Sequence, residues 1–510
     1  MPLSRTANGS SSTLRLIFKN CPPPPEGGLN KPSAKAPFRG WGAKHSNDSS
    51  MKFSLKHTIL LAGLSFAMPS CSFFEVEDTI DPNNPALESV LTNASRIQIN
   101  QMGIGIQSSF RNGQSNLVRV AGSIGREIYN LASTELTWTT ELLGTTNGGF
   151  SATTLFNGYY SDYAQTRRRA EYFKLAAENS APSALTDAEK QGIRGFANTV
   201  SAYTMLYMLN MQYKNGIRIK YTDLYSPGDM LKPGPFVSYE EALKEIRRLL
   251  DEGATQLAAG GTAFGFTMTS GYAGFNTPAN FRKFNRALAA RTAMYQQDWT
   301  GLLTTLNESF FDLNGALTTG PNFTYSTTSG DITNPQFQQL NTTASPVVAQ
   351  ALFITQAEAG DMRVTKKVTK RTSARALNGI IGEYDVSMYP LSTNPISIIR
   401  NEELILMYAE AMIQTGKLTD AVTALNKVRV GAGLKELATA KPAILNDKNA
   451  LIDELLNQRR YSLFFEGHRW FDMRRYGRLA QLPNDQPNHK VYDQLIRPFA
   501  EIQWDAKNPQ

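Results

Sequence analysis

The hydrophobic and polar positions of the chain follow the period of amphipathic helices over much of its length. Within residues 158–178, apolar and aromatic residues recur at mixed three- and four-residue steps, the spacing of one helix face. These residues are Tyr159, Tyr163, Ala170 and Phe173. Residues 83–107 have a similar pattern. The periodicity therefore predicts a helix over each of these two segments.

Three later helices have starts that the sequence marks. The stretches TDAE at 186–189 and SYEE at 238–241 are capping boxes, in which the Ser or Thr oxygen and the Glu carboxylate pair with backbone N–H groups of the first turn. Thr277 precedes Pro278, and proline is tolerated in a first turn because its missing N–H would be unpaired there. We therefore expect helices to begin at these three places.

The clearest pattern is RNEELILMYAEAMIQTGKLTDAVTALNKVRVG at 400–431. Apolar and small residues line one helix, Gly416 breaks it, and a second helix follows. The lining residues are Leu404, Tyr408 and Ala411, then Ala421, Leu425 and Val428. This helix–turn–helix resembles a tetratricopeptide repeat, whose period is about 34 residues. Residues 158–212 and 238–297 can supply more degenerate pairs.

Long irregular segments separate these helices. Residues 210–237, 259–277 and 309–399 are rich in Gly, Thr, Asn, Ser and Pro. The last is far longer than an ordinary connection, which has about 4–6 residues. Because inserts of this length on a helical scaffold usually carry function, we expect residues 309–399 to hold a binding surface or a small strand-bearing subdomain.

The N-terminal region has a different character. Residues 1–50 are basic, rich in Pro and Gly, and lack apolar periodicity. From Met51, two lysines, an apolar run at 58–67 and the small residues before Cys71 follow one another, which is the order of a secretory signal peptide. The run is too short to span a bilayer, which takes roughly 20 residues. We interpret Met51 as the translation start; the alternative is that 1–50 form a disordered extension.

The charge of the chain divides at the same place. Of the 52 basic and 44 acidic residues, nine and two lie in residues 1–70. Residues 71–510 therefore hold 43 and 42, a net charge of +1. A nearly neutral chain has no global field to attract nucleic acid, so we exclude nucleic-acid binding.

Cysteine and histidine counts restrict the chemistry further. The cysteines are Cys21 and Cys71, and the only histidines after residue 70 are His468 and His489. This inventory excludes Cys/His nucleophilic catalysis and His- or Cys-rich zinc sites from the mature chain. A cysteine directly after an apolar signal run indicates cleavage before Cys71 and acylation of its new N-terminus, as in bacterial lipoproteins; the alternative is an ordinary signal cleavage beside an incidental thiol. Acyl chains would anchor the protein to a membrane, with the acidic residues 71–82 as a tether.

A family resemblance rests on LLNQRRYSLFFEGHRWFDMRRYGRL at 455–479. Together with the repeat-like segment before it and the Cys71 signal, this stretch resembles the SusD/RagB family of Bacteroidota outer-membrane lipoproteins. The C-terminal match runs from Asn401 to Leu479. The resemblance implies a mainly α fold, in which tetratricopeptide-like pairs form a right-handed α-α superhelix with loop-rich inserts and a few short strands.

The same resemblance implies a function. The lipoprotein would face the cell exterior, sit as a lid on a SusC-like TonB-dependent barrel, and pass it a captured oligosaccharide or, in RagB-like members, a peptide. It also implies a division of the chain. We expect an extension at 1–50, a signal peptide at 51–70, a tether at 71–82, an N-terminal helical region at 83–308, a loop-rich insert at 309–399 and a C-terminal SusD/RagB region at 400–510.

Many ionisable residues gather near the C-terminus. Glu466, Arg469, Asp472 and Arg475 follow one another at three-residue steps, the spacing of an ion-pair ladder on a helix. A lone histidine beside arginines, without a nucleophile, gives no catalytic constellation. We therefore interpret this cluster as a structural ion-pair network.

Aromatic rings beside hydrogen-bonding groups suit a sugar, which presents a C–H face to a ring and hydroxyls to polar groups. Trp138 and Glu135 lie together in STELTWTTELLG, and Tyr272 and Phe275 lie in FGFTMTSGYAGFN. Both stretches lack helical periodicity, so we predict that these four residues contribute to a glycan site.

Two other classes of protein stay open. A glycoside hydrolase needs only two carboxylates roughly 5–9.5 Å apart, and Glu135 and Glu141 flank Trp138. A scaffold for protein partners would need the repeats but not the long inserts. We expect a non-catalytic protein without a cofactor; a structural calcium ion stays open.

Overall fold

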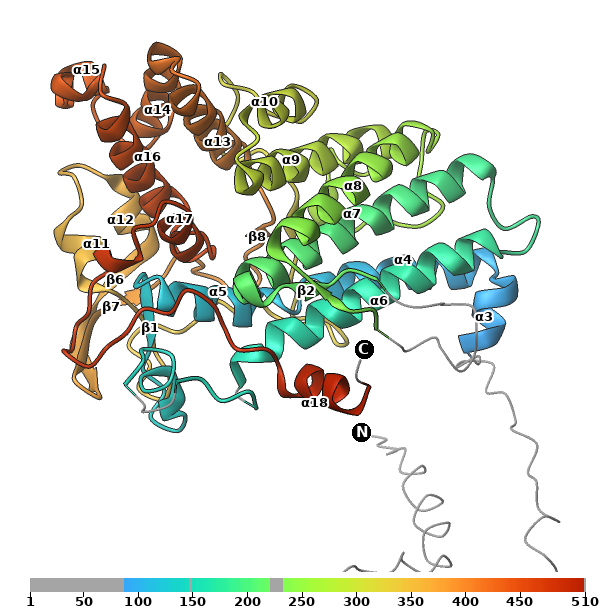
Figure 1. Ribbon diagram of the computed structural model, residues 1–510, viewed down its shortest axis with the longest axis horizontal. Helices are drawn as coiled ribbons and strands as arrows, with labels where there is room; N and C mark the ends of the chain where they lie inside the picture. Colours follow the sequence, from blue (N-terminus) through green and yellow to red (C-terminus); the bar gives the residue numbers. More distant parts are fainter. Residues whose placement is uncertain (1–86, 146–148, 154, 221–232, 509–510) are drawn as a thin grey trace, which may run out of the picture. The chain divides into compact units, whose positions relative to one another are not determined.

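The computed structural model describes residues 87–145, 149–153, 155–220 and 233–508, which are mostly helical (Figure 1). The predicted extension, signal peptide, tether and Cys71 lie outside these residues. The longer helices are α3 (Leu87–Asn93), α4 (Arg96–Phe110), α5 (Gln114–Ile124), α6 (Gly158–Glu178), α7 (Asp187–Gln212), α8 (Tyr239–Ala258), α9 (Pro278–Gln296), α10 (Trp299–Asn307), α13 (Asn401–Gln414), α14 (Leu418–Gly431), α16 (Lys448–Ser462), α17 (Arg469–Arg475) and α18 (Phe499–Lys507). The shorter ones are α11 (Ala351–Thr355), α12 (Met362–Lys367) and α15 (Leu437–Ala440), with 3-10 turns η2 (Leu136–Trp138), η3 (Leu155–Asn157), η4 (Tyr213–Asn215), η5 (Ser270–Tyr272), η6 (Pro442–Ile444) and η7 (Leu479–Gln481).

Consecutive helices pack as pairs, as the sequence predicts. Helices α6, α7, α8 and α9 lie side by side, each against the next, and α13 packs on both α14 and α16 (Figure 1). Thr186 and Ser238 form the two expected capping boxes, and Thr277 caps α9 with Pro278 in its first turn. The mainly α fold with tetratricopeptide-like pairs is thus confirmed.

Close approach of two glycines fixes the central pair. A Cβ on Gly195 of α7 would lie 2.5 Å from Leu257 Cγ and 2.7 Å from the Gly253 carbonyl oxygen of α8. Since Cβ atoms do not approach carbonyl oxygens so closely, only glycine permits this contact. The buried face of α8 carries Leu243, Ile246 and Leu250, while charged residues occupy its other side.

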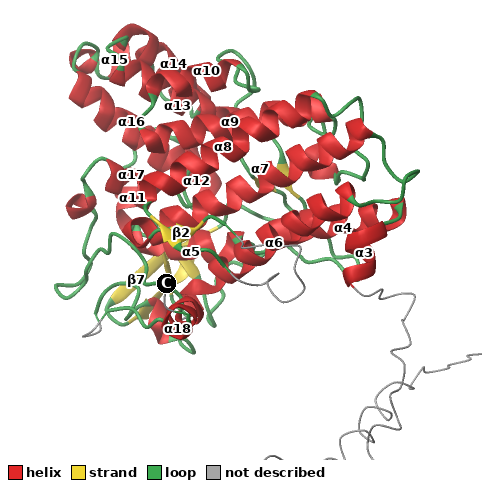
Figure 2. Ribbon diagram, turned by 45° about the vertical axis from the view of Figure 1, so that its right-hand side comes forward, coloured by secondary structure: helices red, strands yellow, loops and turns green. Residues whose placement is uncertain are grey.

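The long insert at 309–399 contains strands, as expected of a strand-bearing segment. Its strands and those that pair with them are β1 (Ile128–Asn130), β4 (Asn322–Phe323), β5 (Val347–Ala349), β6 (Val368–Leu377), β7 (Ile380–Val386) and β8 (Ile396–Ser397); β2 (Ile217–Arg218) and β3 (Phe236–Val237) form a separate ladder. One antiparallel sheet has the order β1-β5-β7-β6. Figure 2 shows the strands in yellow, most of them near β7 and a further short stretch beside α7.

One hydrophobic core runs through all three predicted regions. It includes Phe110 and Leu288 from the helical region, Phe353 from the insert and Trp470 from the C-terminal region. The residues that the structure describes belong to one compact unit. The boundaries at 309 and 400 therefore stay a prediction from sequence.

Candidate functional site

A pocket of about 280 Å³ lies where the C-terminal end of α4 meets η5 and β4. Its lining residues come from both the helical region at 83–308 and the insert at 309–399. We call it the Arg111 pocket. Its lining residues are Ile104, Gln107, Ser108, Arg111, Thr269, Tyr272, Asn322, Phe323, Thr324, Gly330 and Asp331.

Arg111 holds the insert against α4. Its guanidinium donates hydrogen bonds to the Thr324 carbonyl oxygen and to the Asp331 carboxylate. The guanidinium carbon also lies 5.3 Å from the centre of the Tyr325 ring. A bidentate, planar donor of this kind fixes geometry as well as charge, so Arg111 positions the segment from 324 to 331 at the pocket.

Asp331 is held in its ionised form. Burial alone would raise the pKa of Asp331, but hydrogen bonds from Arg111, the Ile332 N–H (2.8 Å) and the Ser326 hydroxyl (2.9 Å) outweigh burial and lower it. An ionised carboxylate accepts several hydrogen bonds at once. The pocket therefore offers an acceptor beside the donors of Arg111.

Three buried polar atoms around this pocket lack a partner among the described residues: the hydroxyl oxygens of Tyr272 and Tyr325 and Nε of Arg111. Tyr272 is 2% exposed and its side chain lines the pocket. Buried polar groups are nearly always satisfied, by protein, water or ligand. The Tyr272 hydroxyl is thus a buried group beside the pocket that lacks a partner among the described residues.

Gly271 explains why Tyr272 lies here. A Cβ on Gly271 would lie 2.0 Å from the Asn322 carbonyl oxygen, so only glycine lets η5 approach β4 this closely. The Tyr272 N–H donates to the Thr269 carbonyl oxygen (3.0 Å). The Gln107 side chain donates to the Thr267 carbonyl oxygen and accepts from the Thr269 N–H. The loop that carries Tyr272 is therefore fixed.

Of the four residues predicted to bind a glycan, Tyr272 lines the Arg111 pocket and the other three are not among its lining residues. Trp138 is 7% exposed and packs edge-on against Phe156, at 5.0 Å. Glu135 caps η2 through the Thr137 N–H. Phe275 is buried against Phe310, with ring centres 5.0 Å apart. A role in glycan binding stays a prediction for all four.

Sequence reasoning missed Arg111 and Asp331. They lie 220 positions apart, and neither belongs to a motif. The only signal near Arg111 is its place directly after a helix, before the small residues Asn112 and Gly113. Nothing in the sequence relates it to the insert.

The predicted ion-pair ladder is only partly present. Asp472 and Arg475 pair at 3.0 Å within α17. However, α17 begins at Arg469, after a turn in which Phe465 and Gly467 have positive φ. Glu466 thus lies outside the helix, and its carboxylate pairs with Arg400 instead.

The remaining partners of the cluster come from other helices. Asp472 also pairs with Arg459 of α16 at 2.7 Å, and Arg475 pairs with Glu410 of α13. Burial alone would raise the pKa of Asp472, but Arg459 and Arg475 lower it to about 2. These contacts join α13, α16 and α17, so the cluster is a long-range structural network rather than a surface ladder.

Another buried acid, Glu127, interacts electrostatically with Arg469. Glu127 is 3% exposed, and neither of its carboxylate oxygens has a hydrogen-bond partner among the described residues. Burial raises the pKa of Glu127 to about 8, against the opposing effect of Arg469, Lys367 and Arg460. At neutral pH this carboxyl group is therefore largely protonated in the folded protein.

Replacing Glu127 with Gln is expected to stabilise the protein at alkaline pH. An unfolded Glu ionises near pH 4.5 and the folded one only near pH 8, so this group lowers the free energy of unfolding as pH rises through that window. The loss between pH 5 and pH 8 is about 3 kcal/mol. Melting temperatures of both proteins at pH 5 and pH 8 test this: the Gln variant should gain relative to the parent at pH 8, and an equal difference at both pH values contradicts it.

Within the described ranges there is no group of three or more His, Cys, Asp or Glu side chains arranged to hold a metal ion. Among the same residues, no helix is long and apolar enough to cross a membrane.

Part of the chain is similar in sequence to known proteins. Residues 288–510 match the SusD family model. A SusD-like protein P38 of Formosa agariphila is 31% identical over 107 residues, which are 20% of this chain and 21% of that protein. The match thus spans about a fifth of that relative.

Solved structures share the fold at low identity. A SusD superfamily protein of Bacteroides vulgatus superposes with a TM-score of 0.57 at 15% identity, covering 80% of this chain and 97% of that one. A laminarin-binding SusD-like protein gives 0.58 at 15%, with 80% and 98% covered.

A SusD-like structure of Bacteroides vulgatus that is described as carbohydrate-binding gives a TM-score of 0.56 at 15% identity, with 74% of this chain and 83% of that one covered. Residues 288–510 thus resemble the SusD family in sequence, and the helical fold resembles that of solved SusD-like structures.

Proposed function

We propose that this protein is a cell-surface lipoprotein that captures an oligosaccharide and delivers it to a SusC-like TonB-dependent barrel in the outer membrane. The sequence match to the SusD family and the likeness to a laminarin-binding SusD-like structure support the ligand class. The observation that carries the proposal is a pocket lined by Arg111 and Asp331, with the buried, unpartnered Tyr272 hydroxyl beside it. Donors and an ionised acceptor within one pocket suit the alternating hydroxyls of a sugar.

Binding in this pocket needs no chemical step. A sugar hydroxyl can accept from the Tyr272 hydroxyl and donate to Asp331, which replaces the hydrogen bonds that it makes to water. Gln107, Thr269 and Asn322 add side-chain amides and a hydroxyl at the walls. Affinity then comes from preorganised groups, because Arg111 and Gly271 already hold the walls in place.

Tyr272→Phe is expected to lower glycan affinity by about three- to tenfold without loss of stability. The change removes one hydrogen bond, worth about 0.5–1.5 kcal/mol, and the hydroxyl has no protein partner to lose. Titration calorimetry against the best-binding oligosaccharide of an array measures the effect.

Tyr325→Phe is the matched control. Its hydroxyl is also buried without a partner, but Tyr325 is not among the lining residues. Equal losses in the two variants, or none in Tyr272→Phe, would contradict the placement of the glycan in the Arg111 pocket. Tighter binding of a peptide than of any sugar would instead favour a RagB-like peptide receptor.

Cys71→Ser is expected to release the protein from the outer membrane. Each buried methylene of an acyl chain contributes about 0.8 kcal/mol, and the variant has no thiol to acylate. Fractionation of cells and a mass spectrum of the N-terminal peptide measure this. An unlipidated N-terminus in the native protein, or one upstream of Cys71, contradicts the lipoprotein assignment.

A further inference from the structure

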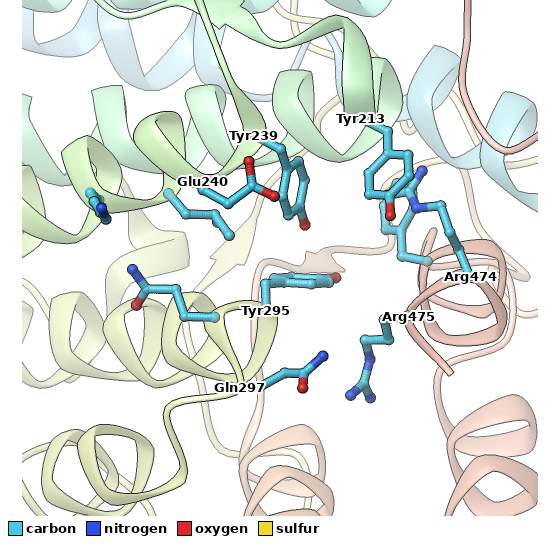
Figure 3. A pocket seen from close by; sticks show the side chains of 11 residues that line it. Tyr213, Tyr239, Glu240, Tyr295, Gln297, Arg474 and Arg475 are labelled. Carbon is cyan, nitrogen blue, oxygen red and sulfur yellow. The ribbon is translucent and has the colours of Figure 1, made fainter. Parts of the chain in front are cut away.

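A second pocket, of about 450 Å³, lies where α7 ends, α8 begins and α9 ends, against α17 (Figure 3). Each of the three helices contributes a tyrosine: Tyr213 at the end of α7, Tyr239 at the start of α8 and Tyr295 at the end of α9. Helix α17 contributes Arg474 and Arg475. We call it the Tyr213 pocket. It shares no lining residue with the Arg111 pocket.

Three tyrosine rings give this pocket aromatic walls. In Figure 3, Tyr239 of α8 and Tyr295 of α9 lie on opposite sides of the space, and Tyr213 lies beside Arg474. The rings of Tyr213 and Tyr239 meet edge to face with centres 5.1 Å apart. Tyr239 is fixed by a hydrogen bond from its hydroxyl to the Asn210 side-chain oxygen (2.9 Å). Such rigid rings present large apolar faces at low entropic cost.

Polar groups surround these rings. Gln296 and Gln297 follow Tyr295 at the end of α9, and Glu240 and Lys244 lie one turn apart on α8. Gln297, Glu240 and Lys244 are exposed. Amide groups both donate and accept hydrogen bonds. Aromatic faces bordered by amides are what a sugar ring requires.

One positive charge in the pocket is not neutralised by the protein. Arg474 is 9% exposed and donates to two carbonyl oxygens, those of Asp493 and Asn210, each at 2.8 Å. Within the described part of the chain it forms no ion pair with a carboxylate. These bonds use two of the five N–H donors of a guanidinium. The Arg474 charge therefore acts on the pocket.

The neighbouring charges cancel. Arg475 pairs with Glu410 and with Asp472, and Asp472 also pairs with Arg459. On α8, Lys244 and Glu240 carry opposite charges. Asp493, whose charge also acts on Arg474, is itself paired with Lys214 at 3.6 Å. Arg474 is therefore left as the net positive charge, and an anionic group on a ligand would complement it.

The backbone at Tyr213 is strained in a way that serves this arrangement. Tyr213 has φ 47° and ψ −114°, a conformation that residues with a Cβ rarely adopt. The strained residue places its ring 4.1 Å from the Arg474 guanidinium carbon. Backbone outliers of this kind gather at functional sites, and here the outlier forms the wall that holds the unneutralised cation.

We infer that the Tyr213 pocket is a second carbohydrate site, separate from the Arg111 pocket, for a short saccharide that bears a carboxylate. The sugar ring lies between Tyr239 and Tyr295, and its carboxylate lies toward Arg474. Gln296 and Gln297 bind ring hydroxyls. This site does not depend on the ligand of the Arg111 pocket.

Titration calorimetry of the full chain in detergent tests the inference. The probes are trisaccharides of galacturonate, mannuronate and glucuronate and a sialylated lactose, each with its neutral methyl ester. At least one acid is expected to bind saturably, about tenfold more tightly than its ester. No saturable binding of any acid, or equal binding of acid and ester, overturns the inference.

Variants place the ligand. Tyr295→Ala is expected to weaken acid binding by about tenfold, which corresponds to about 1.4 kcal/mol. Glu240→Gln should strengthen it by a few fold and Lys244→Gln should weaken it by a few fold; both side chains are exposed, so folding is not at risk. Unchanged binding in all three variants overturns the inference. Loss of acid binding in Tyr272→Phe, which belongs to the other pocket, also overturns it.

Discussion

Arg291→Met is expected to lower the free energy of unfolding by about 3–5 kcal/mol at pH 7. Arg291 of α9 and Glu403 of α13 form a bidentate ion pair with both N–O distances at 2.7 Å, and their side chains are 1% and 2% exposed. Arg291 also donates to the Tyr207 hydroxyl (3.1 Å) and the Ile398 carbonyl (3.2 Å). Removing the guanidinium leaves a buried carboxylate without a counter-charge.

The effect should depend on pH. Burial alone would raise the pKa of Glu403, but Arg291 and His468 lower it to about 2. Its contribution to stability is therefore present above pH 4.5 and is lost as pH falls toward 2. Urea unfolding at pH 7 and pH 4 should show a smaller difference between variant and parent in acid.

The double variant Arg291→Met, Glu403→Leu is the control for the charge. It leaves no unpaired ion, so it should recover most of the loss. The free energy of unfolding of Arg291→Met at pH 7 could instead lie within about 1 kcal/mol of the parent value, well below the cost of breaking a buried pair. That result would contradict a stabilising ion pair between α9 and α13.

Arg111→Ala is expected to lower glycan affinity by about a hundredfold, or about 2.8 kcal/mol. Its guanidinium donates to Thr324 and Asp331, and its removal frees the segment that forms one wall of the pocket. Charge-assisted hydrogen bonds contribute about 1.5–3 kcal/mol each. Arg111→Lys should recover only part of the affinity, because an ammonium group cannot bond both partners in one plane.

Arg119→Ala is the matched control for that variant. Arg119 of α5 also donates to a carbonyl oxygen of the insert, at Pro335 (2.9 Å), but does not line the Arg111 pocket. Calorimetry should find its glycan affinity close to the parent value. A similar loss in both variants would mean that the insert, rather than the pocket, determines binding.

Local features of the sequence predicted much of the fold. The 3.6-residue period gave α6 at its observed bounds, and the capping boxes at Thr186 and Ser238 form as expected. Gly416 has φ +78° between α13 and α14, the left-handed conformation that ends a helix. These signals act within a few residues, so the sequence alone carries them. The predicted helix at 83–107 divides into α3 and α4 at Ala94 and Ser95, where Ser95 forms a capping box.

The candidate sites could not be predicted in the same way. Arg111 meets Asp331, and Tyr213 meets Arg474, only after the chain has folded. Trp138 lies in a stretch with the composition of a sugar platform, but its side chain is buried and meets Phe156 edge to face. Glu466 has the spacing of a ladder, yet the turn at Phe465 and Gly467 removes it from the helix. A three- or four-residue spacing predicts a contact between two side chains only where both lie in the same uninterrupted helix.

The measurement that most directly tests the proposed role is a mild-detergent purification of the tagged protein from its own outer membrane, with mass spectrometry of what accompanies it. The proposal predicts a large TonB-dependent barrel in equimolar amount, retained in Arg111→Ala and lost in Cys71→Ser. Absence of any barrel from the parent preparation would contradict capture for transport and leave a free-standing carbohydrate-binding protein.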